Sequence, residues 1–111
     1  MAVKPYKFKI FGATWTVKLV SAERMLAITG RNAEGATEIL GSRTIYINPD
    51  YLTLQLVLHE LVHAHIAELP LQPAKLSRRQ MDEVYAELIA TRIKDIGRIA
   101  RHVYKYYKAR L

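Results

Sequence analysis

Apolar and polar residues alternate along the first twenty positions of the chain, which is the period of a β-strand with one buried face. Tyr6–Phe11 (YKFKIF) and Thr14–Val20 (TWTVKLV) both follow this alternation. Gly12-Ala13 lies between them. Two alternating runs around a short turn that contains glycine predict a β-hairpin.

The pattern is weak from Ser21 to Glu38, and Gly30, Asn32 and Gly35 indicate turns there. Two more strands are expected at Thr37–Leu40 and Arg43–Asn48, with Gly41-Ser42 between them.

The following segment is the most hydrophobic of the chain. Asn48-Pro49-Asp50 ends the strand before it, and Tyr51–Leu69 is apolar nearly all round. Such a composition is typical of a buried central helix. Pro70 and Pro73 are expected to end this helix, because proline removes a backbone donor and clashes with the preceding turn.

A second long helix is predicted from about Ser77, which suits a helix N-cap, toward the C-terminus. Its apolar residues recur at helical spacing: Met81, Val84, Tyr85, Leu88, Ile89, Ile93, Ile96, Ile99, Ala100 and Val103. The order of elements indicates an α+β domain spanning residues 1–111, with a small antiparallel or mixed sheet of three to four strands followed by two long helices.

Composition narrows the chemistry that the domain can perform. The 111 residues suit one domain, and the absence of cysteine excludes disulfides and thiolate metal sites. Any metal site must therefore use His, Asp and Glu. Met1–Lys9 lacks the continuous apolar run of a secretory signal, and charged side chains interrupt the hydrophobic segment, so we expect a cytoplasmic protein that does not span a membrane.

Positive charge is concentrated in the C-terminal third. Of the net charge of +7, residues 75–111 carry +6 and residues 1–74 carry +1. Such asymmetry is typical of contact with nucleic acid or another anionic surface. A solvated basic helix face is the alternative interpretation, and we favour it.

The hydrophobic segment contains the motif H-E-x-x-H, from His59 to His63. On a helix, side chains at i and i+4 lie one above the other, so both imidazoles can reach one Zn²⁺. Glu60 is rotated by about 100° from His59, which suits a general base beside a metal-bound water. The alternative is a pair of core histidines with hydrogen-bonding neighbours. His65 lies about 200° from His63 and is expected to be a surface or packing residue.

A catalytic zinc site needs a third protein ligand. The extended motif H-E-x-x-H-x-x-G-x-x-H is excluded, because Ile66 and Leu69 occupy its Gly and His positions. The other known arrangement takes a glutamate from a following helix, and Met81–Glu87 (MDEVYAE) offers two.

The H-E-L-V-H motif followed by D-E-V-Y-A-E on a second helix resembles the gluzincin metallopeptidases, whose second helix carries N-E-x-x-[SA]-D. In length the chain resembles the minigluzincins and the small H-E-x-x-H proteins of phages and mobile elements. The resemblance implies that Glu83 is the third zinc ligand. It also implies that Glu87 orients a ligand histidine, and Glu87 is the alternative ligand. Asp82 and Glu87 depart from the Asn and Asp of the family motif.

Helical angles place Glu83 and Glu87 opposite the apolar stripe, where a solvated face is expected. Small residues at Ala86, Ala90 and Gly97 share that side and would allow another helix to approach. We therefore expect the first part of the second helix to pack on the H-E-x-x-H helix, with its later, basic part solvated.

These residues predict an endopeptidase with one Zn²⁺ per chain, held by His59, His63 and Glu83, in which Glu60 activates the metal-bound water. Tyr85, His102, Tyr104 and Tyr106 are candidate donors to the oxyanion. A peptide or protein substrate is expected to lie extended along an edge strand, either Thr37–Leu40 or Arg43–Asn48.

The minigluzincin resemblance further implies latency, with the terminal segment Tyr104–Leu111 occupying the cleft. The alternative function is a non-enzymatic module, stabilised by zinc, whose basic C-terminal helix binds nucleic acid or a protein. A structural zinc normally has four protein ligands and no use for Glu60, so the peptidase is favoured. The sequence leaves the oligomeric state open.

Overall fold

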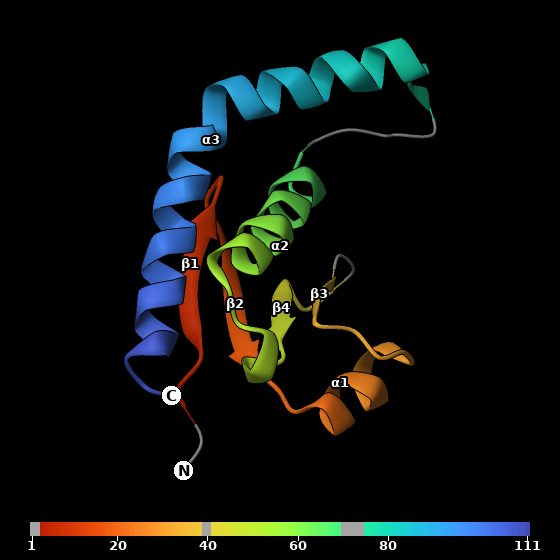
Figure 1. Cartoon of the computed structure of the whole chain (residues 1–111). Helices are drawn as coiled ribbons and strands as arrows, with labels where there is room; N and C mark the ends of the chain where they lie inside the picture. Colours follow the sequence, from red (N-terminus) through yellow and green to blue (C-terminus); the bar gives the residue numbers. More distant parts are fainter. Residues whose placement is uncertain (1–2, 39–40, 70–74) are drawn as a thin grey trace.

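The computed structural model describes residues 3–38, 41–69 and 75–111, and Figure 1 shows a sheet with helices packed against it. The strands are β1 (Tyr6–Ile10), β2 (Ala13–Leu19), β3 (Gly35–Glu38) and β4 (Thr44–Ile47). They lie in the order β1-β2-β4-β3. The outer pairs are antiparallel and the central pair β2/β4 is parallel. The predicted α+β class and the mixed sheet are confirmed.

The β1–β2 hairpin turns at Phe11-Gly12, one residue earlier than predicted. Ile10 pairs with Ala13, and the two residues between them have φ of +48° and +84°. Two positive φ angles define the turn that matches the twist of a tight hairpin. Phe11 takes this conformation although it is not glycine, and its side chain is exposed.

Strand β3 begins two residues before the segment predicted for it, and the last two predicted positions, 39–40, lie outside the described residues. Helix α1 (Ala22–Thr29) is an element that the hydrophobic pattern did not predict. Its ends carry local signals. The Ser21 side chain accepts a hydrogen bond from the Arg24 N–H, and Gly30 takes the left-handed conformation at the C-terminus. The helix has only eight residues, of which Met25 is buried, and so short a segment does not establish a helical period.

A short 3₁₀ turn, η1 (Pro49–Tyr51), leads into α2 (Leu54–Ala67), and α3 (Arg78–Lys108) follows. The two predicted long helices are thus present, and Ser77 caps α3 in a capping box with Gln80. Pro70 and Pro73 lie outside the described residues. Among the helices of residues 3–38, 41–69 and 75–111, none has the length and apolar character needed to cross a membrane.

Helix α3 changes direction near its middle, so its two halves have different surroundings (Figure 1). The second half, residues 94–108, runs beside β1 and α2, whereas the first half, residues 78–93, extends beyond the sheet. Burial follows this division. Ile96, Ile99 and Val103 are buried, whereas Tyr85, Ile89 and Ile93 of the same apolar stripe are exposed.

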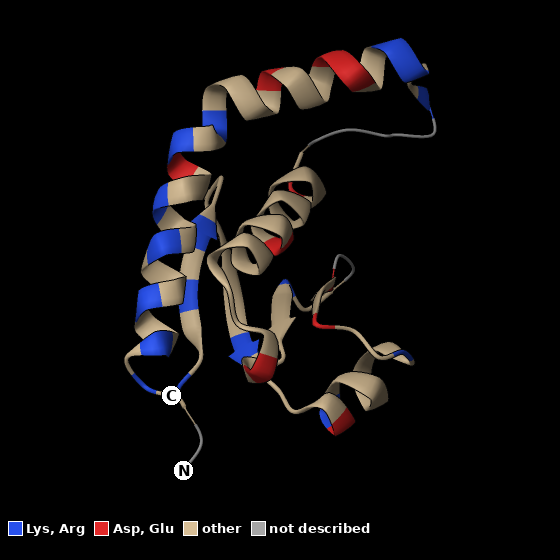
Figure 2. Ribbon diagram, in the orientation of Figure 1, with Lys and Arg blue, Asp and Glu red and all other residues tan. Residues whose placement is uncertain are grey.

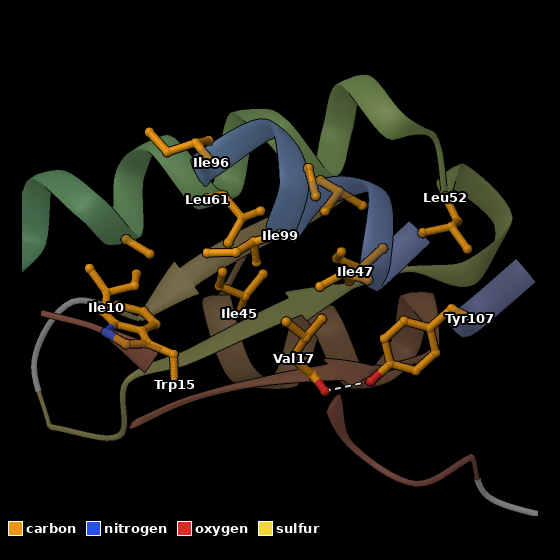
Figure 3. Close-up of a cluster of buried hydrophobic side chains, with 14 residues drawn as sticks. Ile10, Trp15, Val17, Ile45, Ile47, Leu52, Leu61, Ile96, Ile99 and Tyr107 are labelled. Atoms are coloured by element: carbon orange, nitrogen blue, oxygen red, sulfur yellow. Dashed lines mark hydrogen bonds between the residues drawn. The ribbon is translucent and has the colours of Figure 1, made fainter. Parts of the chain in front are cut away.

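The core lies between the sheet, α2 and the second half of α3 (Figure 3). It consists of alternate residues of the strands and one face of each helix, including Ile10, Trp15, Val17, Ile45, Ile47, Leu61, Ile96, Ile99 and Tyr107. Because the period of two places these strand residues on one face of the sheet, the helices cover that face.

Tyr107 ties the end of α3 to the hairpin from inside this core. Its hydroxyl donates to the Val17 carbonyl at 2.5 Å (Figure 3) and accepts from the Tyr6 N–H at 3.0 Å. Burial raises the pKa of the Tyr107 phenol from 10.0 to about 12. The hydroxyl therefore satisfies one backbone group on each strand of the hairpin.

We expect Tyr107→Phe to destabilise the fold by about 1–3 kcal/mol, because it leaves the Val17 carbonyl and the Tyr6 N–H without their partner. Between pH 10 and about 12 the unfolded chain releases the Tyr107 proton while the folded chain keeps it. Wild-type stability should therefore fall as pH rises through this window. Urea unfolding of both proteins from pH 8 to 11.5 measures both effects. Tyr107→Phe should show a smaller decline, and Tyr104→Phe on the same helix is the control.

Candidate metal centre

The two motif histidines lie together on the exposed side of α2. Thr53 starts this helix by accepting a hydrogen bond from the Leu56 N–H. The regular turns that follow place His59 and His63 one turn apart, and both are exposed. Their Nε2 atoms are 3.2 Å apart, and their ring centroids are 4.8 Å apart.

This separation matches what zinc requires of two ligands. With Zn–N distances of about 2.0–2.1 Å and tetrahedral angles, two ligand nitrogens lie about 3.3–3.4 Å apart. The observed 3.2 Å is close to that value. The imidazole pair therefore fits two corners of a tetrahedral zinc site.

Glu60 lies about 100° around α2 from His59, and its side chain contacts the sheet. Its side chain is buried, with 5% of the residue exposed. The Thr37 hydroxyl of β3 lies 3.0 Å from Glu60 Oε2 and 3.1 Å from the Glu60 carbonyl oxygen. The Glu60 carboxylate is thus held against β3 by a hydrogen bond from Thr37.

His65 is a packing residue, one of the two roles that its angle on the helix predicts. It is fully buried, and its Nδ1 donates to the Leu61 carbonyl at 2.7 Å. Burial lowers the pKa of the imidazole. His65 is therefore held as a neutral side chain inside the fold, away from the pair formed by His59 and His63.

Glu83 lies on the first half of α3 in a solvated position. Its side chain is 73% exposed, and its nearest cationic partner is Arg79, with 3.9 Å between Arg79 Nε and Glu83 Oε1. Within residues 3–38, 41–69 and 75–111, no three His, Asp or Glu side chains gather closely enough to hold a metal. The structure thus brings together two of the three expected ligands.

The side of α3 that carries Glu83 faces solvent. Glu87, Ala86 and Ala90 are all exposed. The prediction that this side packs on α2 is therefore wrong for the conformation described. Leu88 of the apolar stripe is buried, and Glu87 lines a cavity of about 240 Å³ together with Val84, Leu88, Leu69 and the hairpin tip at Phe11.

The candidate oxyanion donors lie on α3, in different surroundings. Tyr85 and His102 are exposed, and Tyr104 is half-buried. The Tyr106 hydroxyl donates to the Lys4 carbonyl at 3.0 Å, and its ring packs on Tyr6.

The segment Tyr104–Leu111 contains the last turn of α3, and it contacts the N-terminal strand. Latency through this segment stays a prediction, and it would require the last turn of α3 to leave these contacts.

Two cavities border β3. One, of about 390 Å³, is lined by His59, Glu34 and residues at the start of α2. The other, of about 570 Å³, lies between the end of α1 and residues Ala36–Glu38. Of the two strands considered for substrate, β3 is at the sheet edge, whereas β4 lies between β2 and β3. The edge-strand expectation for Arg43–Asn48 is therefore wrong.

Basic residues recur along the second half of α3 (Figure 2). Lys94, Arg98, Arg101, Lys105 and Lys108 are all exposed. Their spacing confines them to about a quarter of the helix circumference. The basic side of this part of the helix is thus solvated as predicted, whereas its opposite side, with Ile96, Ile99 and Val103, packs in the core.

Gly35, Thr37 and Glu34 were not predicted as parts of the site. Thr37 and Glu60 are separated by 23 positions. No local pattern marks a threonine that will face a particular carboxylate, because β3 meets α2 only after the sheet has formed. The one available signal is the period of two, which places Gly35 and Thr37 on the same face of β3.

No protein-family model matches this chain, and neither curated proteins nor solved structures give a significant match. The resemblance to gluzincins therefore depends on the motif residues of α2 and α3 themselves.

If the imidazole pair binds zinc, His59→Ala and His63→Ala should each lose the metal, because each removes a ligand. Wild type should carry about one zinc per chain, and zinc should raise its melting temperature. Metal analysis after dialysis and thermal melting with and without zinc measure both effects. His102→Ala, which removes an exposed histidine of α3, is the matched control. Full zinc occupancy in both α2 variants would exclude this site.

The two glutamates can be separated by their zinc affinities. If Glu83 is the third ligand, Glu83→Ala should lose most of the affinity, whereas Glu87→Ala should weaken it by about 10–100-fold. Competition against a chelator of known affinity gives both values. In metal-free protein Glu83→Ala should hardly change the melting temperature, because its pair with Arg79 is exposed. A larger zinc loss in Glu87→Ala would move the ligand to Glu87.

Proposed function

We propose that the protein is a zinc-dependent endopeptidase. The observation that carries this proposal is the arrangement on α2: two imidazole nitrogens at a zinc-like separation, next to a buried glutamate on the adjacent helix face. A site that only stabilised the fold would normally have four protein ligands and no need for Glu60.

His59 and His63 would hold the zinc ion, and the gluzincin resemblance supplies Glu83 as the third ligand. A bound zinc supplies Lewis-acid chemistry to peptide hydrolysis. The pair that Glu83 forms with Arg79 is long and exposed, so this pair alone would not hold Glu83 away from the zinc ion.

Glu60 is the proposed general base. It accepts a proton from the attacking water as the new C–O bond forms, and it delivers that proton to the amine as the C–N bond breaks. Burial restricts the side chain to few rotamers, and the Thr37 hydrogen bond restricts it further. Such a fixed carboxylate suits proton transfer, which depends on geometry before acidity.

The proposed substrate is an extended segment of polypeptide that adds to the edge of β3. An edge strand offers unpaired backbone groups, and an extended peptide satisfies them by strand addition. The cavities beside β3, at Glu34 and His59 and at the end of α1, leave room for side chains of such a peptide.

Glu60→Gln is the variant that tests the peptidase. The amide keeps the shape and can still accept the Thr37 hydrogen bond, but it cannot take the proton of water. We expect zinc content and melting temperature close to those of wild type, with hydrolysis of fluorogenic casein reduced by about 10²–10⁴-fold. His59→Ala, which should lose both metal and activity, is the comparison. Unchanged turnover in Glu60→Gln would favour the non-enzymatic module that binds nucleic acid or protein through α3.

A further inference from the structure

Thr37 provides the hydrogen bond that Glu60 receives from the sheet. Its Oγ1 lies 3.0 Å from Glu60 Oε2 and 3.1 Å from the Glu60 carbonyl oxygen. A hydroxyl has a single proton to donate, and the charged carboxylate is the stronger acceptor. The carboxylate is therefore held in one orientation by a residue of β3.

Gly35, two residues earlier on the same face of β3, leaves the space that Glu60 occupies. A Cβ at this position would lie 3.3 Å from Glu60 Cγ, 3.2 Å from Leu56 Cδ1 and 3.3 Å from the Tyr46 carbonyl oxygen. All three separations are tighter than ordinary contacts. Gly35 thus leaves space for the Glu60 side chain, and Thr37 holds its carboxylate by a hydrogen bond.

The backbone of Thr37 faces the open edge of the sheet. In an antiparallel pair, residues alternate between hydrogen-bonded and non-hydrogen-bonded positions. The Asn48 N–H donates to the Glu34 carbonyl, and the register pairs Gly35 with Ile47 and Thr37 with Ile45. Gly35 and Thr37 therefore occupy non-hydrogen-bonded positions, and their N–H and C=O groups point away from β4.

We propose that Thr37 is a positioning residue that aligns the Glu60 carboxylate relative to a peptide bound along β3. The inference rests on the proposed function. Thr37 would bind the peptide through its backbone and Glu60 through its hydroxyl. The base and the peptide would therefore be held by the same residue. The alternative role is structural: the hydroxyl satisfies a buried carboxylate and has no effect on catalysis.

The first experiment measures thermal stability and does not depend on peptidase activity. Thr37→Val removes the hydroxyl and keeps the branched shape. In metal-free protein with chelator, it should lower the melting temperature of wild type by more than that of Glu60→Ala, because in Glu60→Ala the hydroxyl has only the backbone carbonyl of residue 60 left as its acceptor. Equal shifts in the two backgrounds would show that no hydrogen bond couples the residues, and they would overturn the proposal.

The second experiment measures hydrolysis of fluorogenic casein by the zinc-loaded full chain. Thr37→Val should reduce kcat by about 10–100-fold, because misplacement of a catalytic group by about 1 Å has an effect of this size. KM should stay within about twofold, since the backbone of residue 37 is retained. Thr37→Ser keeps the hydroxyl and should restore most of kcat. The matched control is Thr44→Val on β4, whose hydroxyl donates to the Ser42 carbonyl.

Different results would contradict the role of Thr37 and the proposed peptidase activity. Wild-type kcat in Thr37→Val, with Glu60→Gln inactive, overturns the role of Thr37 alone. Equal losses in Thr37→Val, Thr37→Ser and Thr44→Val indicate general damage to the sheet, and they overturn it as well. A wild type that never exceeds Glu60→Gln overturns the peptidase and any catalytic role of Thr37, while the melting experiment still decides whether the hydrogen bond exists.

Discussion

The structure depends on the burial of α2, a helix that is apolar nearly all round. Such a helix cannot be covered by a single layer, because a sheet contacts only one of its faces. The sheet covers one side through Ile45 and Ile47, and the second half of α3 covers another through Ile96 and Ile99. Only a narrow strip of α2 remains exposed, and His59 and His63 lie on it.

The need to cover α2 also explains why the two halves of α3 differ in burial. Its second half is committed to the core, and Tyr107 ties it to both strands of the hairpin. Its first half extends beyond the sheet, and Ile89 and Ile93 of the same apolar stripe stay about half exposed. The glutamates that resemble the gluzincin motif lie on this less constrained half, where only the weak Arg79–Glu83 pair holds Glu83.

Strand β3 connects the two sides of the candidate site. It is an edge strand of the sheet, and its residue Thr37 donates a hydrogen bond to Glu60 of α2. The buried carboxylate needs a hydrogen-bond donor, because an ionised group without one is costly to bury. Thr37 meets that need from the edge strand, and its own backbone groups point away from β4. The proposed base, its support and the proposed substrate path therefore share one short segment of chain.

The sequence by itself determined the elements whose signals are local. The period of two predicted the hairpin, the apolar run predicted α2, and Ser77 marked the start of α3. The spacing of His59 and His63 was enough to place their imidazoles together, because four residues make about one helical turn. The sequence did not predict helix α1, because eight residues are too few for apolar positions to establish a helical period.

Tertiary structure alone decided the contacts between distant segments. The parallel pairing of β2 with β4, the edge position of β3 and the bond from Thr37 to Glu60 join residues far apart in the chain. The same holds for the exposure of Glu83. A helical pattern shows which residues share a face, but the partner that covers this face is set by the packing of the whole core.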